Sequence, residues 1–142
     1  MTTRMSQPER EEFLAGVHVA VLSAAAGDDR GPLIVPVWYS YQPGGLVSVS
    51  TDRDSRKARA VTAAGRLSLC AQDERPPYKY VTVEGPAVIE EISLDERREL
   101  ARRYLGTEDG DAFIASTPGD NDIVIRMTPE HWLSADFGQD QA

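Results

Sequence analysis

The feature that most constrains the fold is a series of short apolar segments separated by turn-forming residues. Residues 33–41 are rich in β-branched and aromatic side chains, and a Pro-Gly-Gly turn separates them from the alternating segment 46–50. Two segments at this spacing predict a β-hairpin. Further segments of strand character cover residues 17–25, 67–72, 79–92, 123–127 and 132–135. This pattern favours an antiparallel barrel with peripheral helices over alternating βαβ units.

The expected helices are marked by caps. Residues 6–9 (Ser-Gln-Pro-Glu) and 93–96 (Ser-Leu-Asp-Glu) are capping boxes, and each predicts the start of a helix. Another helix is expected over residues 56–64, between a cap at Asp54 or Ser55 and a stop at Gly65, and a weaker one over 109–115. The charged run 95–103 is interpreted as a solvated helix face. At 142 residues, the chain is expected to form one domain, residues 1–142.

The distribution of charge is uneven. The chain carries a net charge of −8, which disfavours a nucleic-acid partner because such binding needs basic residues to neutralise phosphates. Residues 53–79 nevertheless contain seven basic and three acidic side chains, an excess of four positive charges. We interpret this basic segment as a local site for a small anion, with a solvated basic surface as the alternative.

Several classes of protein and of site are not supported by the sequence. No apolar stretch reaches the ~20 residues of a membrane span, and the first twelve residues lack the apolar core of a secretory signal. The single cysteine, Cys70, fits a reducing compartment, so a cytoplasmic location is expected. Cys70, His18 and His131 have no metal-ligand spacing, and no nucleotide-binding glycine motif or nucleophile elbow occurs. We therefore expect no metal site and assign no catalytic residue.

Three neighbouring segments combine features of a ligand site. Residues 36–39 (Pro-Val-Trp-Tyr) can form an apolar wall beside residues 49–51 (Val-Ser-Thr). Residues 55–57 (Ser-Arg-Lys) then open a helix, where backbone N–H groups and two cations favour a phosphate. An apolar wall beside an anion site suits a phosphorylated aromatic cofactor.

Four motifs of the sequence carry a resemblance to a known family. They are PVWYSY, VSVSTDRDSRKARAV, RLSLCAQDERPPYKYVTVEGPAVI and IRMTPEHWLSADFG, which together cover roughly residues 10–138. In these motifs the chain resembles the flavin/deazaflavin oxidoreductases of the pyridoxamine 5′-phosphate oxidase-like, FMN-binding split-barrel superfamily. It is most similar to the branch that uses the deazaflavin F420. The resemblance implies a mainly β fold, a six-stranded split barrel, that forms a homodimer with cofactor sites at the subunit interface.

The resemblance also implies which residues contact the cofactor. Residues 35–38 would lie along the tricyclic ring, 50–51 near the ribityl chain and phosphate, and 55–57 at the phosphate, while 77–79 would face the site from the partner subunit. The implied cofactor-binding residues are Val35, Pro36, Val37, Trp38, Ser50, Thr51, Ser55, Arg56, Lys57, Pro77, Tyr78 and Lys79.

The function that follows is hydride transfer from reduced F420 to a small unsaturated organic substrate. The cofactor would supply the chemistry, which agrees with the lack of an acid–base constellation. The excess positive charge of residues 53–79 favours F420 over FMN, because F420 adds a polyglutamyl tail whose carboxylates need neutralising. The alternatives are an FMN-dependent oxidoreductase, a non-catalytic flavin or haem carrier, and a structural subunit without a ligand.

Overall fold

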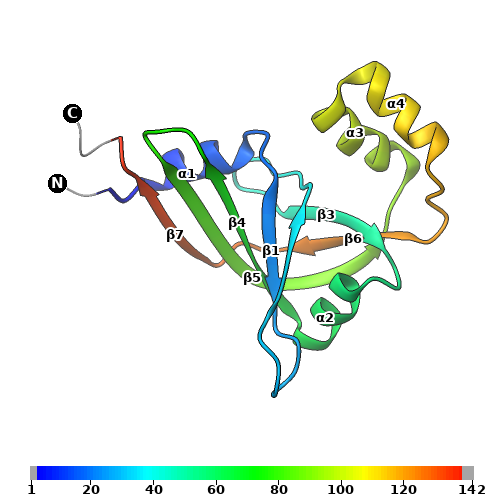
Figure 1. Cartoon of the computed structure of the whole chain (residues 1–142), viewed down its shortest axis with the longest axis horizontal. Helices are drawn as coiled ribbons and strands as arrows, with labels where there is room; N and C mark the ends of the chain where they lie inside the picture. Colours follow the sequence, from blue (N-terminus) through cyan, green and yellow to red (C-terminus); the bar gives the residue numbers. More distant parts are fainter. Residues whose placement is uncertain (1–2, 139–142) are drawn as a thin grey trace.

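A computed structural model describes residues 3–138, which form one curled seven-stranded sheet with four helices around it (Figure 1). Six strands follow the order β2-β1-β4-β5-β6-β3, all antiparallel, and β7 pairs with β5. The strands are β1 (Ala20–Ala24), β2 (Leu33–Val37), β3 (Val47–Asp52), β4 (Arg66–Asp73), β5 (Lys79–Glu91), β6 (Asp122–Met127) and β7 (His131–Asp136). The predicted split β-barrel is confirmed, with one strand more than the resemblance implied because β7 adds to the sheet.

The long strand β5 joins the two halves of the barrel. Its first half pairs with β4 and β7, and its second half, from Ala87 onward, pairs with β6. Gly85 lies at the change of partner, where a Cβ atom would collide with the carbonyl of Thr128. A glycine is required here because the chain that leaves β6 passes directly over β5.

The helices begin and end close to the predicted residues. They are α1 (Gln7–Ala15), α2 (Arg56–Ala64), α3 (Leu94–Leu105) and α4 (Thr107–Ser116). Ser6 caps α1, Ser55 caps α2 and Ser93 caps α3, and each hydroxyl accepts a hydrogen bond from a backbone N–H of the first turn. Gly65 ends α2 with a φ of 72°, the left-handed conformation that favours glycine. None of the helices within residues 3–138 is long and apolar enough to cross a membrane.

The core lies inside the curled sheet, where alternate residues of β5 are buried together with three consecutive residues of β3 (47–49) and of β6 (123–125). On the outer face, five residues from five neighbouring strands are in register and form a row with mostly apolar side chains. This outer row runs Pro36–Val21–Cys70–Thr82–Leu133. Val21 and Leu133 remain 37% and 61% exposed, so the row leaves apolar surface open to solvent. Pro36 lies on the edge strand β2, as expected for a residue without an amide donor.

Candidate functional site

The predicted ligand site corresponds to a cavity of about 310 Å³, hereafter the α2 cavity, between the ends of β2 and β3 and the helices α2, α3 and α4. Six of its lining residues are among those that the resemblance implied: Pro36, Val37, Trp38, Ser50, Thr51 and Lys57. The other lining residues come mainly from the two later helices and the chain that follows them: Arg97, Leu100, Ala101, Phe113, Ile114, Thr117, Pro118 and Asp122. Segments far apart in the sequence thus meet at one site.

The cavity exists because the barrel closes only partly between β2 and β3. The prediction that residues 33–41 and 46–50 form a hairpin is wrong. The two strands in these segments do not pair with each other, since β2 pairs with β1 and β3 pairs with β6. The two segments share a single bridge, in which the amides and carbonyls of Ser40 and Ser48 bond reciprocally at 2.9 and 3.0 Å. Between Val37 and this bridge the chain leaves the strand, because the amide of Tyr39 bonds to a side chain of α3 instead.

The start of α2 forms one side of the cavity. The Ser55 hydroxyl accepts hydrogen bonds from the amide of Ala58 at 3.2 Å and from the hydroxyl of Thr51 at 3.1 Å. The amides of Arg56 and Lys57 precede the first intrahelical hydrogen bonds and are free to meet an anion. Of the four helices in residues 3–138, α2 alone has no acidic residue in its first turn.

Lys57 carries the uncompensated charge of the site. It is half-buried, lines the cavity and makes no ion pair within residues 3–138. The nearest candidate in sequence, Asp54, instead accepts a hydrogen bond from the Asn121 side chain at 2.9 Å. Arg56 is also without an ion pair among these residues and is exposed. A half-buried ammonium without an ion pair among these residues favours an anionic ligand.

The cavity lining also contains aromatic side chains. The Trp38 ring is stacked on the Tyr104 ring, with centroids 4.8 Å apart and planes 5° apart. Phe113, from α4, lies 5.9 Å from Trp38 and is tilted by 52°. The cavity lining therefore combines a flat aromatic ring with a half-buried cation.

Sequence reasoning missed the contribution of α3 and α4. Arg97 was assigned to a solvated helix face, but its side chain is only 11% exposed and its Nε lies 3.0 Å from a carboxylate oxygen of Asp122. Its guanidinium occupies the space that a side chain at position 119 would fill, which Gly119 leaves open. The available signal was the spacing of Arg97 with Leu100, Ala101 and Tyr104, which places an arginine within an apolar stripe.

The remaining predicted site residues lie outside the cavity lining. Val35 packs against the core, and Ser55 and Arg56 flank the cavity at the start of α2. Residues 77–79 lie at the β4–β5 connection, on the side of the sheet away from α3 and α4 (Figure 1). There the Lys79 ammonium lies 5.7 Å from the centre of the Phe13 ring. Within one chain, residues 77–79 are not brought to the cavity, so their contact from a partner subunit stays a prediction.

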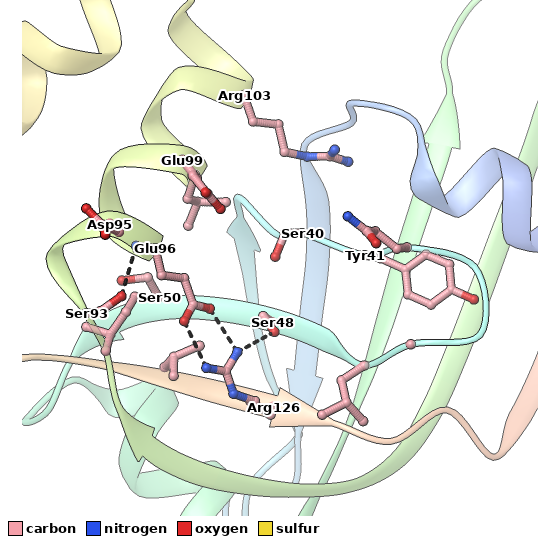
Figure 2. Close-up of a pocket in the computed structure, with 16 residues that line it drawn as sticks. Ser40, Tyr41, Ser48, Ser50, Ser93, Asp95, Glu96, Glu99, Arg103 and Arg126 are labelled. Atoms are coloured by element: carbon pink, nitrogen blue, oxygen red, sulfur yellow. Dashed lines mark hydrogen bonds and ion pairs between the residues drawn. The ribbon is translucent and has the colours of Figure 1, made fainter. Parts of the chain in front are cut away.

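A larger cavity of about 790 Å³ adjoins the α2 cavity and shares Ser50 and Leu100 with it. Figure 2 shows Arg126 at its floor, bonded to both carboxylate oxygens of Glu96 at 2.8 Å and to the Ser48 hydroxyl at 2.9 Å. The hydrogen bonds to Glu96 and to Glu90 raise the pKa of Arg126 well above its usual value. The strongest cation of this cavity is thus already paired, and Ser50 is the only implied cofactor residue in its lining.

Comparison with known proteins identifies a family that matches the chain. The family model for pyridoxamine 5′-phosphate oxidase matches residues 6–135. Among proteins of curated function, no sequence matches the chain.

Solved structures share the fold. A conserved hypothetical protein from Mycobacterium tuberculosis is similar with a TM-score of 0.79 and 21% identity, over 99% of this chain and 91% of that one. An F420 reductase is similar with a TM-score of 0.70 and 21% identity, over 87% and 94%. An FAD-binding protein from Mesorhizobium loti has a TM-score of 0.64 and 19% identity, over 92% and 93%.

Proposed function

The chain belongs to the pyridoxamine 5′-phosphate oxidase family, and from this premise we propose that it is an oxidoreductase that transfers hydride from reduced F420 to a small unsaturated organic substrate. The observation that carries the proposal is the position of Lys57. It is a half-buried ammonium with no ion pair within residues 3–138, in the lining of a cavity that also contains Trp38 and Phe113.

The cofactor phosphate would bind at the start of α2. The amides of Arg56 and Lys57, the positive end of the helix dipole and the Lys57 ammonium all favour a dianion there. Thr51 and Ser55, whose hydroxyls are bonded to each other, lie at the same end. The tricyclic ring would then extend along Pro36, Val37 and Trp38 toward the aromatic end, which is the order the family resemblance implied.

The residues of this chain would bind and orient the cofactor and exclude water from it. When bound, the reduced deazaflavin supplies the hydride. Leu100, Ala101 and Phe113 add apolar surface to the wall formed by Trp38. The carboxylate of Asp122 is held by Arg97, so it does not compete for Lys57. A volume of about 310 Å³ is at the lower end of the roughly 300–1,000 Å³ of ligand pockets, which suits a site completed by a second subunit.

A homodimer would complete the site. The outer row of residues exposes apolar side chains on five neighbouring strands, an arrangement typical of a protein–protein interface. Pro36 belongs both to this row and to the cavity lining, so a partner docked on the row would lie next to the cofactor. Two-fold symmetry would bring residues 77–79 of each chain toward the other's site.

Two features favour F420 over FMN. Residues 53–79 carry an excess of four positive charges, and within residues 3–138 neither Arg56 nor Arg59 at the surface of α2 has an ion pair. Such free cations suit the polyglutamyl tail of F420. A solved structure of an F420 reductase also shares the fold. FMN is the second candidate, because its phosphate needs the same cationic end.

Cofactor reoxidation tests the proposed function. The protein is mixed with reduced F420, or with reduced FMN, and with a panel of enones and quinones, and oxidation of the cofactor is followed against a protein-free control. We expect acceleration with F420 and at least one acceptor. Tight binding without any acceleration would indicate a carrier protein instead, and acceleration with FMN alone would identify an FMN-dependent enzyme.

A further inference from the structure

A tyrosine from α3 is inserted between two strands beside the α2 cavity. Strands β1 and β2 pair from Ala24–Leu33 to Ala20–Val37, and the same register would place His18 opposite Tyr39. Instead, the Tyr104 hydroxyl occupies the space between them. It accepts a hydrogen bond from the amide of Tyr39 at 3.0 Å and donates one to the carbonyl of His18 at 2.6 Å. One side chain thus replaces a direct strand-to-strand bond and separates the strands.

The insertion fixes the orientation of Trp38. This residue lies between Val37, the last residue of β2, and Tyr39, whose amide is held by Tyr104. The Trp38 ring also stacks on the Tyr104 ring at 4.8 Å. Tyr104 therefore holds both the backbone beside Trp38 and the indole itself.

The neighbouring residue holds the end of α3 in place. The Arg103 guanidinium donates hydrogen bonds to the carbonyls of Ala15 and Gly16 at the end of α1, at 3.0 and 2.8 Å. It also lies 5.6 Å from the centre of the Tyr39 ring. Because α3 is fixed against α1, the Tyr104 hydroxyl is held at a defined position in the gap between the strands.

We propose that Tyr104 is a positioning residue for the ring of the bound cofactor: its hydroxyl separates β1 from β2 and its ring holds Trp38 as the flat wall of the α2 cavity. The identity of the ligand rests on the proposed function, whereas the role of Tyr104 in holding Trp38 does not. Tyr104 lies outside the cavity lining, so it acts through Trp38 and not by touching the ligand. Its loss should weaken binding of the ring and leave the contribution of the phosphate unchanged.

The ligand test compares cofactors with and without a phosphate. FMN is titrated alongside riboflavin, and F420 alongside its phosphate-free deazaflavin, against the wild type, Tyr104→Phe and Tyr104→Leu. The hydroxyl makes two ordinary hydrogen bonds of about 1 kcal/mol each, so Tyr104→Phe should lower the population with Trp38 in place. Both members of a pair should then bind more weakly by the same factor, at most roughly 30-fold. Tyr104→Leu, which also loses the stacked ring, should weaken both further. Tyr41→Phe, which loses a hydrogen bond from its hydroxyl to Glu11 outside the α2 cavity, is the matched control and should change neither.

A second readout needs no cofactor. The chain contains two tryptophans, so Trp132→Phe leaves Trp38 as the only tryptophan. In this background we expect Tyr104→Phe to increase quenching of Trp38 fluorescence by acrylamide, and Tyr104→Leu to increase it more and to shift the emission to the red. Unchanged quenching in both variants would overturn the positioning role.

The two readouts separate the possible failures. If the wild type binds neither flavin nor deazaflavin, the proposed function fails, and the quenching alone decides the role of Tyr104. If Tyr104→Phe weakens binding of FMN or F420 but not of the phosphate-free compound, Tyr104 acts at the phosphate end and the inference is wrong. Equal affinity in the wild type and both Tyr104 variants would also overturn it.

Discussion

Replacing Lys57 with alanine should weaken cofactor binding without unfolding the protein. The ammonium would donate a charge-assisted hydrogen bond to the phosphate, and such bonds contribute about 1.5–3 kcal/mol. Because about 1.4 kcal/mol corresponds to a factor of ten, the Kd should rise roughly 10- to 100-fold. Lys57 has no ion pair within residues 3–138, so its loss leaves no carboxylate there without a partner. The free energy of unfolding of the apoprotein should therefore change little.

The assay is an equilibrium titration followed by cofactor fluorescence, with thermal unfolding of the apoprotein measured in parallel. Riboflavin, which lacks the phosphate, should bind Lys57→Ala and the wild type equally. Lys57→Arg keeps the positive charge and should recover part of the affinity. Arg98→Ala is the control for overall charge, because Arg98 lies on α3 outside the cavity and pairs with Asp95 at 3.3 Å.

Two results would refute this reasoning. An unchanged Kd for F420 and FMN in Lys57→Ala would mean that Lys57 is a solvated helix residue. An equal loss in Lys57→Ala and Arg98→Ala would mean that the overall field of the protein, and not a phosphate site at α2, sets the affinity.

Three further predictions concern the interface, the pH dependence and the barrel. Val21→Lys places a charge within the exposed outer row and should convert a dimer to a monomer in sedimentation at micromolar concentration; a dimer that persists would place the interface elsewhere. Burial raises the pKa of Tyr39, whose hydroxyl donates a hydrogen bond to the carbonyl of Leu14. As the pH rises, this tyrosine therefore ionises in the unfolded chain before it ionises in the folded protein. The free energy of unfolding should be constant below about pH 10 and fall above it. By pH 11 this group should cost about 1.4 kcal/mol of stability, and urea unfolding should show a smaller alkaline loss in Tyr39→Phe; an identical loss in both proteins would exclude Tyr39 as the cause. Gly85→Ala should lower the free energy of unfolding by about 1–3 kcal/mol or more, because the new Cβ atom collides with the Thr128 carbonyl. The measurement is a lower Tm. An unchanged Tm would show that the segment after β6 can move away from β5 freely.

Local signals in the sequence predicted the helices well. Ser55 and Gly65 mark the two ends of α2 because a side-chain cap and a left-handed glycine act within one turn of the backbone. The basic character of residues 55–57 likewise identified the cationic end of the cavity, since the start of a helix and its first side chains are neighbours in sequence as well as in space.

Contacts between distant segments could not be read in the same way. The segments 33–41 and 46–50 have hairpin spacing, yet they pair only at Ser40 and Ser48, because β1 and β6 are the partners of β2 and β3. The sequence predicts a surface position for Arg97, because its pairing with Asp122 depends on how α3 meets β6 across 25 positions of sequence. Helical spacing shows that Arg97 shares a stripe with apolar residues, but it does not show what that stripe covers.

The most direct test of the proposed cofactor site is a crystal structure of the protein with F420 bound. We predict a cofactor phosphate within hydrogen-bond distance of the Lys57 ammonium and the first amides of α2, with the tricyclic ring against Pro36, Val37 and Trp38. A ligand seated in the larger cavity beside Arg126, or a phosphate held away from α2, would contradict the proposed site.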